Sequence, residues 1–187
     1  VVGSGLDFVG SQDEEGGRMA TEHLIELGHR RIAFIGGVDG ASTTDNRRKG
    51  YRAALAAEGL PFDETLVFSG WARRDTGNAA LDAALSLPDP PTAAVCLNDV
   101  TAFGVMLGLY RRGLTPGRDF SLVGYDDTPE APMWHPGLTT LHHSLPPGQV
   151  AAETLFARLK DPRCAQQRRA IAPKLIVRGS SEPPRGS

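Results

Sequence analysis

Short apolar runs alternate with amphipathic helical segments along most of this 187-residue chain, and this alternation constrains its fold more than any other feature. Apolar runs predict strands at 32–37, 66–70, 92–98, 120–127 and 138–143, and residues 170–180 offer one or two more. Helical spacing predicts helices at 14–27, 45–58, 76–87, 99–112 and 146–159. We therefore expect an α/β fold with a doubly wound parallel sheet.

Composition excludes several classes of protein. The net charge of −2 argues against a surface that coats nucleic acid, and paired arginines such as Arg168 and Arg169 are interpreted as solvated helix ends. No run of about 18 apolar residues predicts a membrane span. Cys96 and Cys164 form no CxxC motif, so we expect neither a zinc site nor a disulfide framework. These features fit a reducing cytoplasm.

Polar residues follow the predicted strands at their carboxyl ends. In a doubly wound sheet the ligand crevice lies at these ends, so such residues are the first candidates for a site. They are the predicted loop 42–47, Ser69 to Trp71, Asn98 with Asp99, and Asp126 with Asp127.

Catalytic motifs are missing from the sequence. There is no GxxxxGK[ST], GxSxG or HExxH pattern. His142 and His143 are neighbours on a predicted strand, so their side chains point to opposite faces and cannot chelate one ion together. No nucleophile with a base and an orienting group is evident. We therefore expect a protein that is not an enzyme and that needs neither a cofactor nor a metal ion.

Five stretches carry a family resemblance. They are EEGGRMATEHLIELGHRRIAFIGG, DNRRKGYRAALAAEGL, PPTAAVCLNDVTAFGVMLGLYRRGLTPGRDFSLVGYDDTPEA, HPGLTTLHHSLPPGQVAAETLFARL and LIVRGSSEPP. In this order and spacing, over about residues 9–184, the chain resembles the LacI/GalR family of bacterial transcriptional repressors.

The resemblance implies a two-lobed fold like that of a type I periplasmic binding protein, with a ligand between the lobes. The C-terminal lobe would comprise about residues 12–142 and 174–178, and remnants of the N-terminal lobe about 1–11 and 145–172. Such proteins begin with a helix-turn-helix that binds operator DNA, which this chain lacks. Because the chain also starts at Val1 without an initiator Met, we expect more sequence upstream.

The resemblance also assigns effector-binding residues. Arg47 matches the arginine that reaches into the family's cleft, and its fixed fork of donors suits hydroxyls or a carboxylate. Asn98 and Asp126 match polar cleft residues, although both could instead cap a helix or turn. Trp71 could stack on a sugar, or it could pack in the core or in an interface. His143 could face the ligand or serve structurally, and the weaker candidates are Thr43 and Asp13.

The family's dimer surface falls on two further stretches. Val105 and Met106 look exposed on the helix 99–112, and Met133 and Trp134 lie in an otherwise polar turn. The alternative for Trp134 is a residue that folds back on its own lobe. We expect a symmetric homodimer, because helix-turn-helix dimers read pseudo-palindromic operators.

Three functions remain open at this point. The favoured function is the sensing domain of a repressor that binds a sugar-like effector, with no membrane contact. The rival is a periplasmic sugar-binding protein of a transporter, which has the same fold. A sugar-modifying enzyme on a similar fold would need a base and a nucleophile that we do not find.

Overall fold

A six-stranded sheet forms the main body of the molecule in the computed structural model, which describes residues 5–185. Its order is β3-β2-β4-β5-β6-β8, and every neighbouring pair is parallel except β6 and β8. The strands are β2 (Ile32–Ile35), β3 (Val67–Phe68), β4 (Ala93–Cys96), β5 (Ser121–Tyr125), β6 (Thr139–His143) and β8 (Pro173–Ile176). The predicted doubly wound parallel sheet is confirmed.

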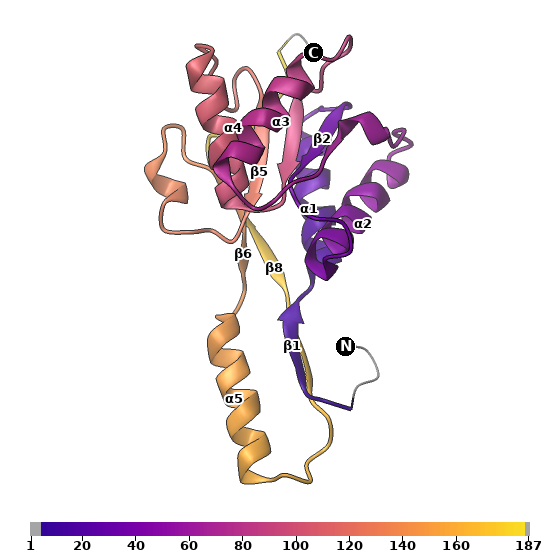
Figure 1. Ribbon diagram of the computed structural model, residues 1–187, viewed down its shortest axis with the longest axis vertical. Coiled ribbons are helices and arrows are strands. Elements are labelled where there is room, and N and C mark those ends of the chain that lie inside the picture. The colour runs from indigo at the N-terminus through magenta and orange to yellow at the C-terminus, as the bar shows by residue number, and fades with distance from the viewer. Residues whose placement is uncertain (1–4, 186–187) are drawn as a thin grey trace.

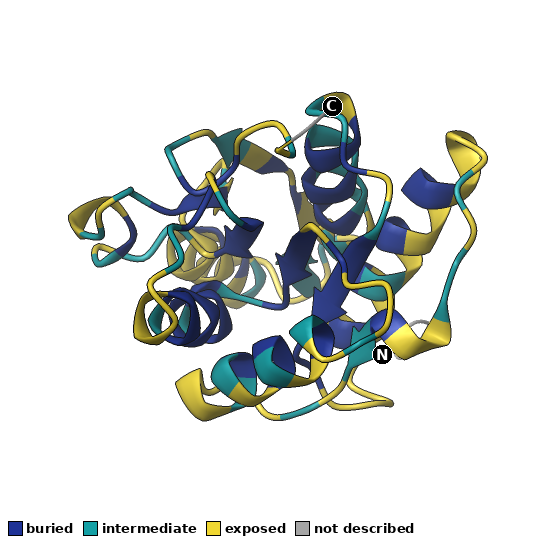
Figure 2. Ribbon diagram, turned by 90° about the horizontal axis from the view of Figure 1, so that it is seen from above, coloured by how far each residue is buried: buried dark blue, intermediate teal, exposed yellow. Residues whose placement is uncertain are grey.

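Helices cover both faces of this sheet (Figures 1 and 2). One face carries α1 (Asp13–Glu26) and α2 (Ser42–Ala57), and the other carries α3 (Arg74–Leu85) and α4 (Asp99–Arg111). Side chains alternate along each strand, so Ile32 and Phe34 pack under the first pair of helices, while Ala33 and Ile35 pack under the second. The strands are therefore apolar throughout, as their sequences predict.

Glycines bring the helices of each pair into contact. A Cβ atom on Gly17 would lie 2.0 Å from the carbonyl oxygen of Arg47, and one on Gly50 would lie 1.9 Å from that of Glu14. The second pair repeats this arrangement at Gly77 and Gly104. Because no side chain larger than hydrogen fits, the backbones of α1 and α2 touch directly, which fixes Arg47 beside the start of α1.

A smaller unit lies below the main sheet in Figure 1. It contains a two-stranded parallel sheet of β1 (Phe8–Ser11) and β7 (Arg168–Ile171), with α5 (Pro147–Lys160) beside it. Three connections join the two units, and they bond to one another. Gln12 N donates to Ile171 O at 2.9 Å, Ser144 N donates to Ala172 O at 2.9 Å, and Ser11 Oγ lies 3.2 Å from Nδ1 of His143.

Several predicted boundaries differ from the structure. Residues 42–47, predicted as a loop, form the first turns of α2, because Thr44 and Arg47 turn inward and are buried. The predicted strand 66–70 shortens to Val67–Phe68 after a 3₁₀ turn at Glu64–Leu66. The predicted remnant 1–11 is described only from residue 5. No helix among residues 5–185 is both long and apolar enough to span a membrane.

The predicted exposure of Val105 and Met106 is wrong. Both residues are 0% exposed, because the glycine contacts press α4 against α3 and enclose this part of the helix. The ring of Trp134 stacks on Phe103 with centroids 5.2 Å apart, and its Nε1 donates to Glu130 at 3.1 Å. Trp134 therefore folds back on its own lobe, whereas Met133 is 78% exposed.

A buried carboxylate on α4 bonds to the loop that follows β5 and to the strand β6. Asp99, at the start of α4, accepts bonds from Thr128 N at 2.7 Å and from the Thr140 hydroxyl at 2.5 Å. The side chain is completely buried, and this burial raises the pKa of Asp99 to about 6, although its hydrogen bonds oppose the shift.

Substitution of Gly50 by alanine tests the contact between α1 and α2. The new methyl group would overlap the Glu14 carbonyl, so we expect Gly50→Ala to lower the free energy of unfolding by at least about 2 kcal/mol. The control is Gly148→Ala in α5, which meets no atom within 4 Å and should gain up to about 1 kcal/mol. Urea denaturation measures both; equal stability of the two variants would contradict the close packing.

The Asp99 carboxylate predicts a pH dependence of stability. Its folded pKa of about 6 lies above the ordinary 3.8, so the folded state holds the proton more tightly and gains stability below about pH 4. We expect the unfolding free energy of wild type, relative to Asp99→Asn, to fall by up to about 3 kcal/mol between pH 4 and 6. The asparagine can keep the bonds to both threonines. A difference that rises with pH would contradict this assignment.

Candidate functional site

A pocket of about 430 Å³ lies at the carboxyl ends of the main sheet, between the two units. From β1 and β7 it is lined by Phe8, Gly10, Ser11 and Arg168. From the start of α1 and the first turns of α2 it is lined by Asp13, Ser42, Thr43, Asn46 and Arg47. The structure therefore brings three predicted effector-binding residues together here: Asp13, Thr43 and Arg47.

Arg47 is held rigidly at the wall of this pocket. It is 7% exposed, its Nε donates to Asp13 at 2.9 Å, and one terminal nitrogen donates to the Leu97 carbonyl at 2.5 Å. The guanidinium lies 3.4 Å from the centroid of the Tyr125 ring. A buried cation needs such partners, and the same partners fix the direction in which the remaining donors point.

Asp126 directly follows β5 beside the same cluster. Its φ of 114° is unusual for a residue with a side chain, and such strain concentrates at functional sites. Part of the residue reaches solvent, but neighbouring atoms displace water from the carboxyl group, which raises its pKa. The positive charge of Arg47 opposes this shift and the negative charge of Asp13 adds to it. Asp126 thus belongs electrostatically to the Arg47 cluster.

The two neighbouring histidines on β6 face opposite ways, as predicted. The ring of His143 lies 5.7 Å from that of Tyr125 and contacts Ser11, so it joins the cluster at the pocket. His142 instead lies 3.5 Å from the carboxylate of Asp127. Desolvation lowers the pKa of His143, and the charge of Arg47 lowers it further. Both effects favour the neutral form of His143.

Asn98 is the N-cap of α4. Its side-chain oxygen accepts bonds from the backbone nitrogen of Thr101 at 3.1 Å and from the Thr101 hydroxyl at 2.9 Å. The capping interpretation of the sequence is therefore correct, and what Asn98 can still offer a ligand is its amide nitrogen. It follows Leu97, whose carbonyl accepts from Arg47, so it lies one residue from the cluster.

Trp71 does not join these residues. It lies on the loop after β3 and is 68% exposed, so it does not pack in the core. It does not line the pocket between the units. Its position at the carboxyl end of β3 matches the prediction, but its stacking role stays a prediction.

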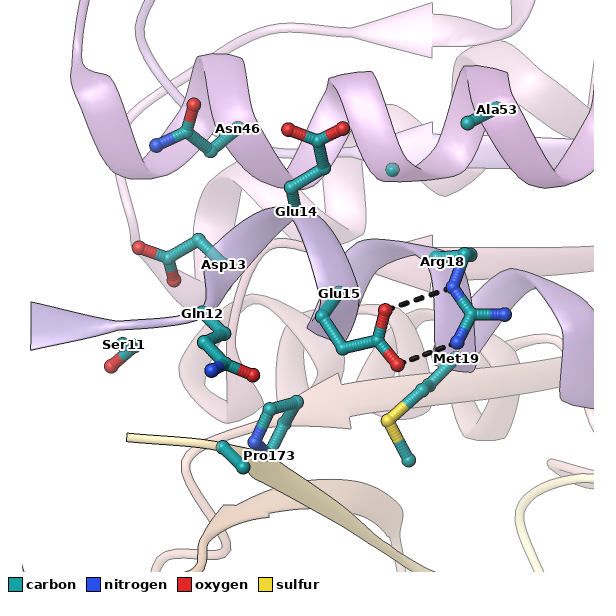
Figure 3. A pocket seen from close by; sticks show the side chains of 12 residues that line it. Ser11, Gln12, Asp13, Glu14, Glu15, Arg18, Met19, Asn46, Ala53 and Pro173 are labelled. Atoms are coloured by element: carbon teal, nitrogen blue, oxygen red, sulfur yellow. Dashed lines mark hydrogen bonds and ion pairs between the residues drawn. The ribbon is translucent and has the colours of Figure 1, made fainter. Parts of the chain in front are cut away.

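A larger pocket of about 550 Å³ lies on the other side of the start of α1 (Figure 3). It shares Ser11, Asp13 and Asn46 with the first pocket but is lined further by Glu14, Glu15 and Arg18. These charged groups are engaged within the protein: Arg18 pairs with Glu15, as the dashed lines in Figure 3 show, and Lys49 pairs with Glu14. The smaller pocket is the better candidate because Thr43 and the fixed Arg47 line it and do not line the larger pocket.

Four residues of β1 and β7 that line the smaller pocket, Phe8, Gly10, Ser11 and Arg168, were not predicted from the sequence. Phe8 was not singled out, and Arg168 was interpreted as part of a solvated helix end, whereas it lies on the strand β7. The pairing of β1 with β7 joins residues about 160 positions apart. No local pattern reveals such a pairing.

Among residues 5–185, no group of three or more His, Cys, Asp or Glu side chains could hold a metal ion. The pocket between the units offers a fixed guanidinium, one carboxylate, hydroxyls and an aromatic ring. Such groups recognise a small polar molecule.

Comparison with known proteins agrees with this geometry. Residues 21–181 match the family of periplasmic binding protein-like domains. The HTH-type transcriptional repressor PurR of Haemophilus influenzae (strain PittEE) is 35% identical over 178 residues, which are 93% of this chain and 53% of the repressor. The chain thus spans about half the length of the curated relatives that it matches.

Solved structures of regulators resemble the whole described fold. A LacI family transcriptional regulator from Mycobacterium smegmatis is 36% identical, with a TM-score of 0.84, covering 95% of this chain and 67% of that one. A LacI family regulator from Enterococcus faecium with bound ribose is 28% identical, with a TM-score of 0.88, covering 95% and 66%.

These relatives are transcriptional regulators, which supports the regulator interpretation of the sequence and not the transporter alternative. The chain belongs to the LacI family of transcriptional regulators, and it corresponds to the periplasmic binding protein-like domain of that family.

Proposed function

We propose that this chain is the sensing domain of a transcriptional repressor and that it binds a sugar-like effector in the pocket between its two units. The observation that carries the proposal is the position of Arg47, a buried guanidinium fixed by Asp13, Leu97 and Tyr125 at the carboxyl ends of the strands. The ribose bound to the Enterococcus faecium relative supports the same class of ligand.

The chemistry of the cluster suits a polyhydroxylated ligand. The remaining donors of Arg47 can bind two adjacent hydroxyl oxygens, and the Asp126 carboxylate can accept bonds from hydroxyl groups. The Phe8 ring offers an apolar surface for the C–H face of a sugar. None of these groups forms a nucleophile with a base, so the proposed role is binding rather than catalysis.

Because the pocket lies between the two units, an effector that binds there changes how the units are arranged. Its walls come from both units, so an effector that contacts both favours the arrangement in which they lie closest. Coupling between two sites in a protein is typically about 1–3 kcal/mol, which is enough to change operator occupancy. In this proposal a helix-turn-helix elsewhere in the whole protein binds DNA in the cytoplasm, and the effector alters that binding.

The proposed assembly is a symmetric homodimer that uses the surface around Met133. Because Val105 and Met106 are buried, they are left out of this surface. Trp134 stacks on Phe103 and Tyr110, and this stacking holds the turn at residues 131–134 against the lobe. Met133 is exposed on that turn. An exposed methionine above a rigid aromatic stack is a suitable anchor for a partner.

Substitution of Arg47 tests the binding proposal. We expect Arg47→Ala to weaken effector binding at least tenfold, because a charged hydrogen bond contributes roughly 1.5–3 kcal/mol. Arg47→Lys keeps the charge but loses the fork, so it should restore only part of the affinity. Calorimetric titration with ribose and a panel of other sugars, on the protein in the full length that its gene encodes, measures the change.

The control for this experiment is Arg52→Ala on the same helix. Arg52 is exposed and contacts Phe62 and Glu64 rather than the pocket, so its loss should leave affinity unchanged. Equal affinity of wild type and Arg47→Ala would contradict the assigned site.

Substitution of Met133 tests the proposed dimer. We expect Met133→Glu to run as a monomer in sedimentation at micromolar concentration and to lose operator binding, because it places a charge in the interface. The matched control is Val38→Glu, an exposed apolar residue on a different loop, which should stay dimeric. A Met133→Glu protein that remains dimeric would place the interface on another surface.

A further inference from the structure

Arg168 lies where a charged group can select among effectors. It lines the pocket from β7 and pairs in register with Phe8 of the neighbouring strand β1. Its guanidinium carbon lies 5.3 Å from the centroid of the Phe8 ring. Both side chains therefore face the pocket from the smaller unit, opposite to Arg47 and Asp13.

The alternation of faces in this small sheet separates Arg168 from its neighbour Arg169. Phe8 and Gly10 line the pocket, while Val9 lines a different cavity beside α5. Arg169 pairs in register with Val9, so it belongs to the other face. The two adjacent arginines thus form a natural pair for comparison, with one in the pocket and one outside it.

Gly10 shapes the surface next to Arg168. A Cβ atom on Gly10 would lie 2.6 Å from the tip of the Phe8 ring, so the ring lies over Gly10 along the strand. The Phe8 ring consequently lines the pocket, with the guanidinium of Arg168 over the ring.

The charges that line the pocket do not cancel. Asp13, the single carboxylate among the lining residues, is bound by Arg47. Arg168 has no carboxylate partner within the described part of the chain, and it is exposed to solvent. The amino end of α2, which begins at Ser42 in the opposite wall of the pocket, adds positive potential from that side. Among the charged lining residues that the structure describes, Arg168 is therefore the one without an opposite charge bound to it, and it lies on the side of β7.

We propose that the effector is an acidic sugar derivative and that Arg168 binds its anionic group, either a carboxylate or a phosphate. The inference rests on the proposed function, because it concerns the ligand of the same pocket. The sugar ring lies over Phe8 and near Arg47, and the anionic group meets the guanidinium of Arg168, whose donors match two anionic oxygens. A neutral sugar offers this guanidinium no anionic partner.

The test compares sugars that differ only in their anionic group. The probes are glucose, glucuronate and glucose 6-phosphate; galactose and galacturonate; and ribose and ribose 5-phosphate. Calorimetric titration uses the protein in the full length that its gene encodes. We expect at least one acidic sugar to bind at least tenfold more tightly than its neutral counterpart. Preference for a uronate or for a phosphate ester identifies which anionic group the protein recognises.

Variants assign this preference to Arg168. We expect Arg168→Gln to remove the preference while it leaves the affinity for the neutral sugar within about twofold, and Arg168→Lys to restore part of it. Arg169→Gln, on the other face of the same strand, should retain the full preference.

Three other results would contradict the acidic effector, the role of Arg168 or the proposed function itself. Neutral sugars that bind as tightly as acidic ones, and that still require Arg47, overturn the acidic effector but leave the proposed function intact. A preference that survives Arg168→Gln overturns the role of Arg168. Failure of every sugar in the panel to bind overturns both proposals.

Discussion

The direct contact between the backbones of α1 and α2 is the constraint on which the site depends. Gly17 and Gly50 leave no space between the two helices, and this contact brings Asp13 on one helix to Arg47 on the other. The guanidinium then lies flat against Tyr125 at the end of β5. A wider helix spacing would leave a buried cation without its carboxylate partner, which is costly. The close packing of α1 against α2 therefore determines the geometry of the site.

Arg47 also organises the charges around the pocket. It pairs with Asp13, opposes the raised pKa of Asp126 and lowers that of His143. A ligand that displaces water from this cluster therefore changes the surroundings of three titratable groups at once. Because Arg47 already has fixed partners, little conformational entropy remains to be lost when its free donors bind a ligand.

Much of the fold could be predicted because its signals are local. Apolar runs and helical spacing located every strand of the main sheet and all five helices, with shifts of a few residues at their ends. The misassignments have a different origin. Val105 and Met106 look exposed on a helical wheel, but glycines on two helices decide how much of α4 is covered. Such tertiary packing is not visible in the periodicity of one segment.

The residues of the candidate site likewise divide into those that the sequence predicts and those that only the tertiary structure reveals. Asp13, Thr43 and Arg47 follow strands in sequence, so the rule about strand ends or the family resemblance finds them. Phe8 and Arg168 become neighbours only when β1 pairs with β7, across most of the chain. Asn98 shows a further limit: its sequence position fitted a cap and a ligand group equally well, and only the bonds to Thr101 identify the cap.

The three connections between the two units constrain how they can move. Residues 11–12, 143–144 and 171–172 are bonded side by side, so the three connections form one hinge between the units. Such an arrangement permits rotation about one axis and resists sliding or twisting about others. In the proposed function, a small molecule that binds between the units would then drive them in one direction. Even a modest binding energy would then produce one reproducible displacement of the two units rather than many small, independent movements.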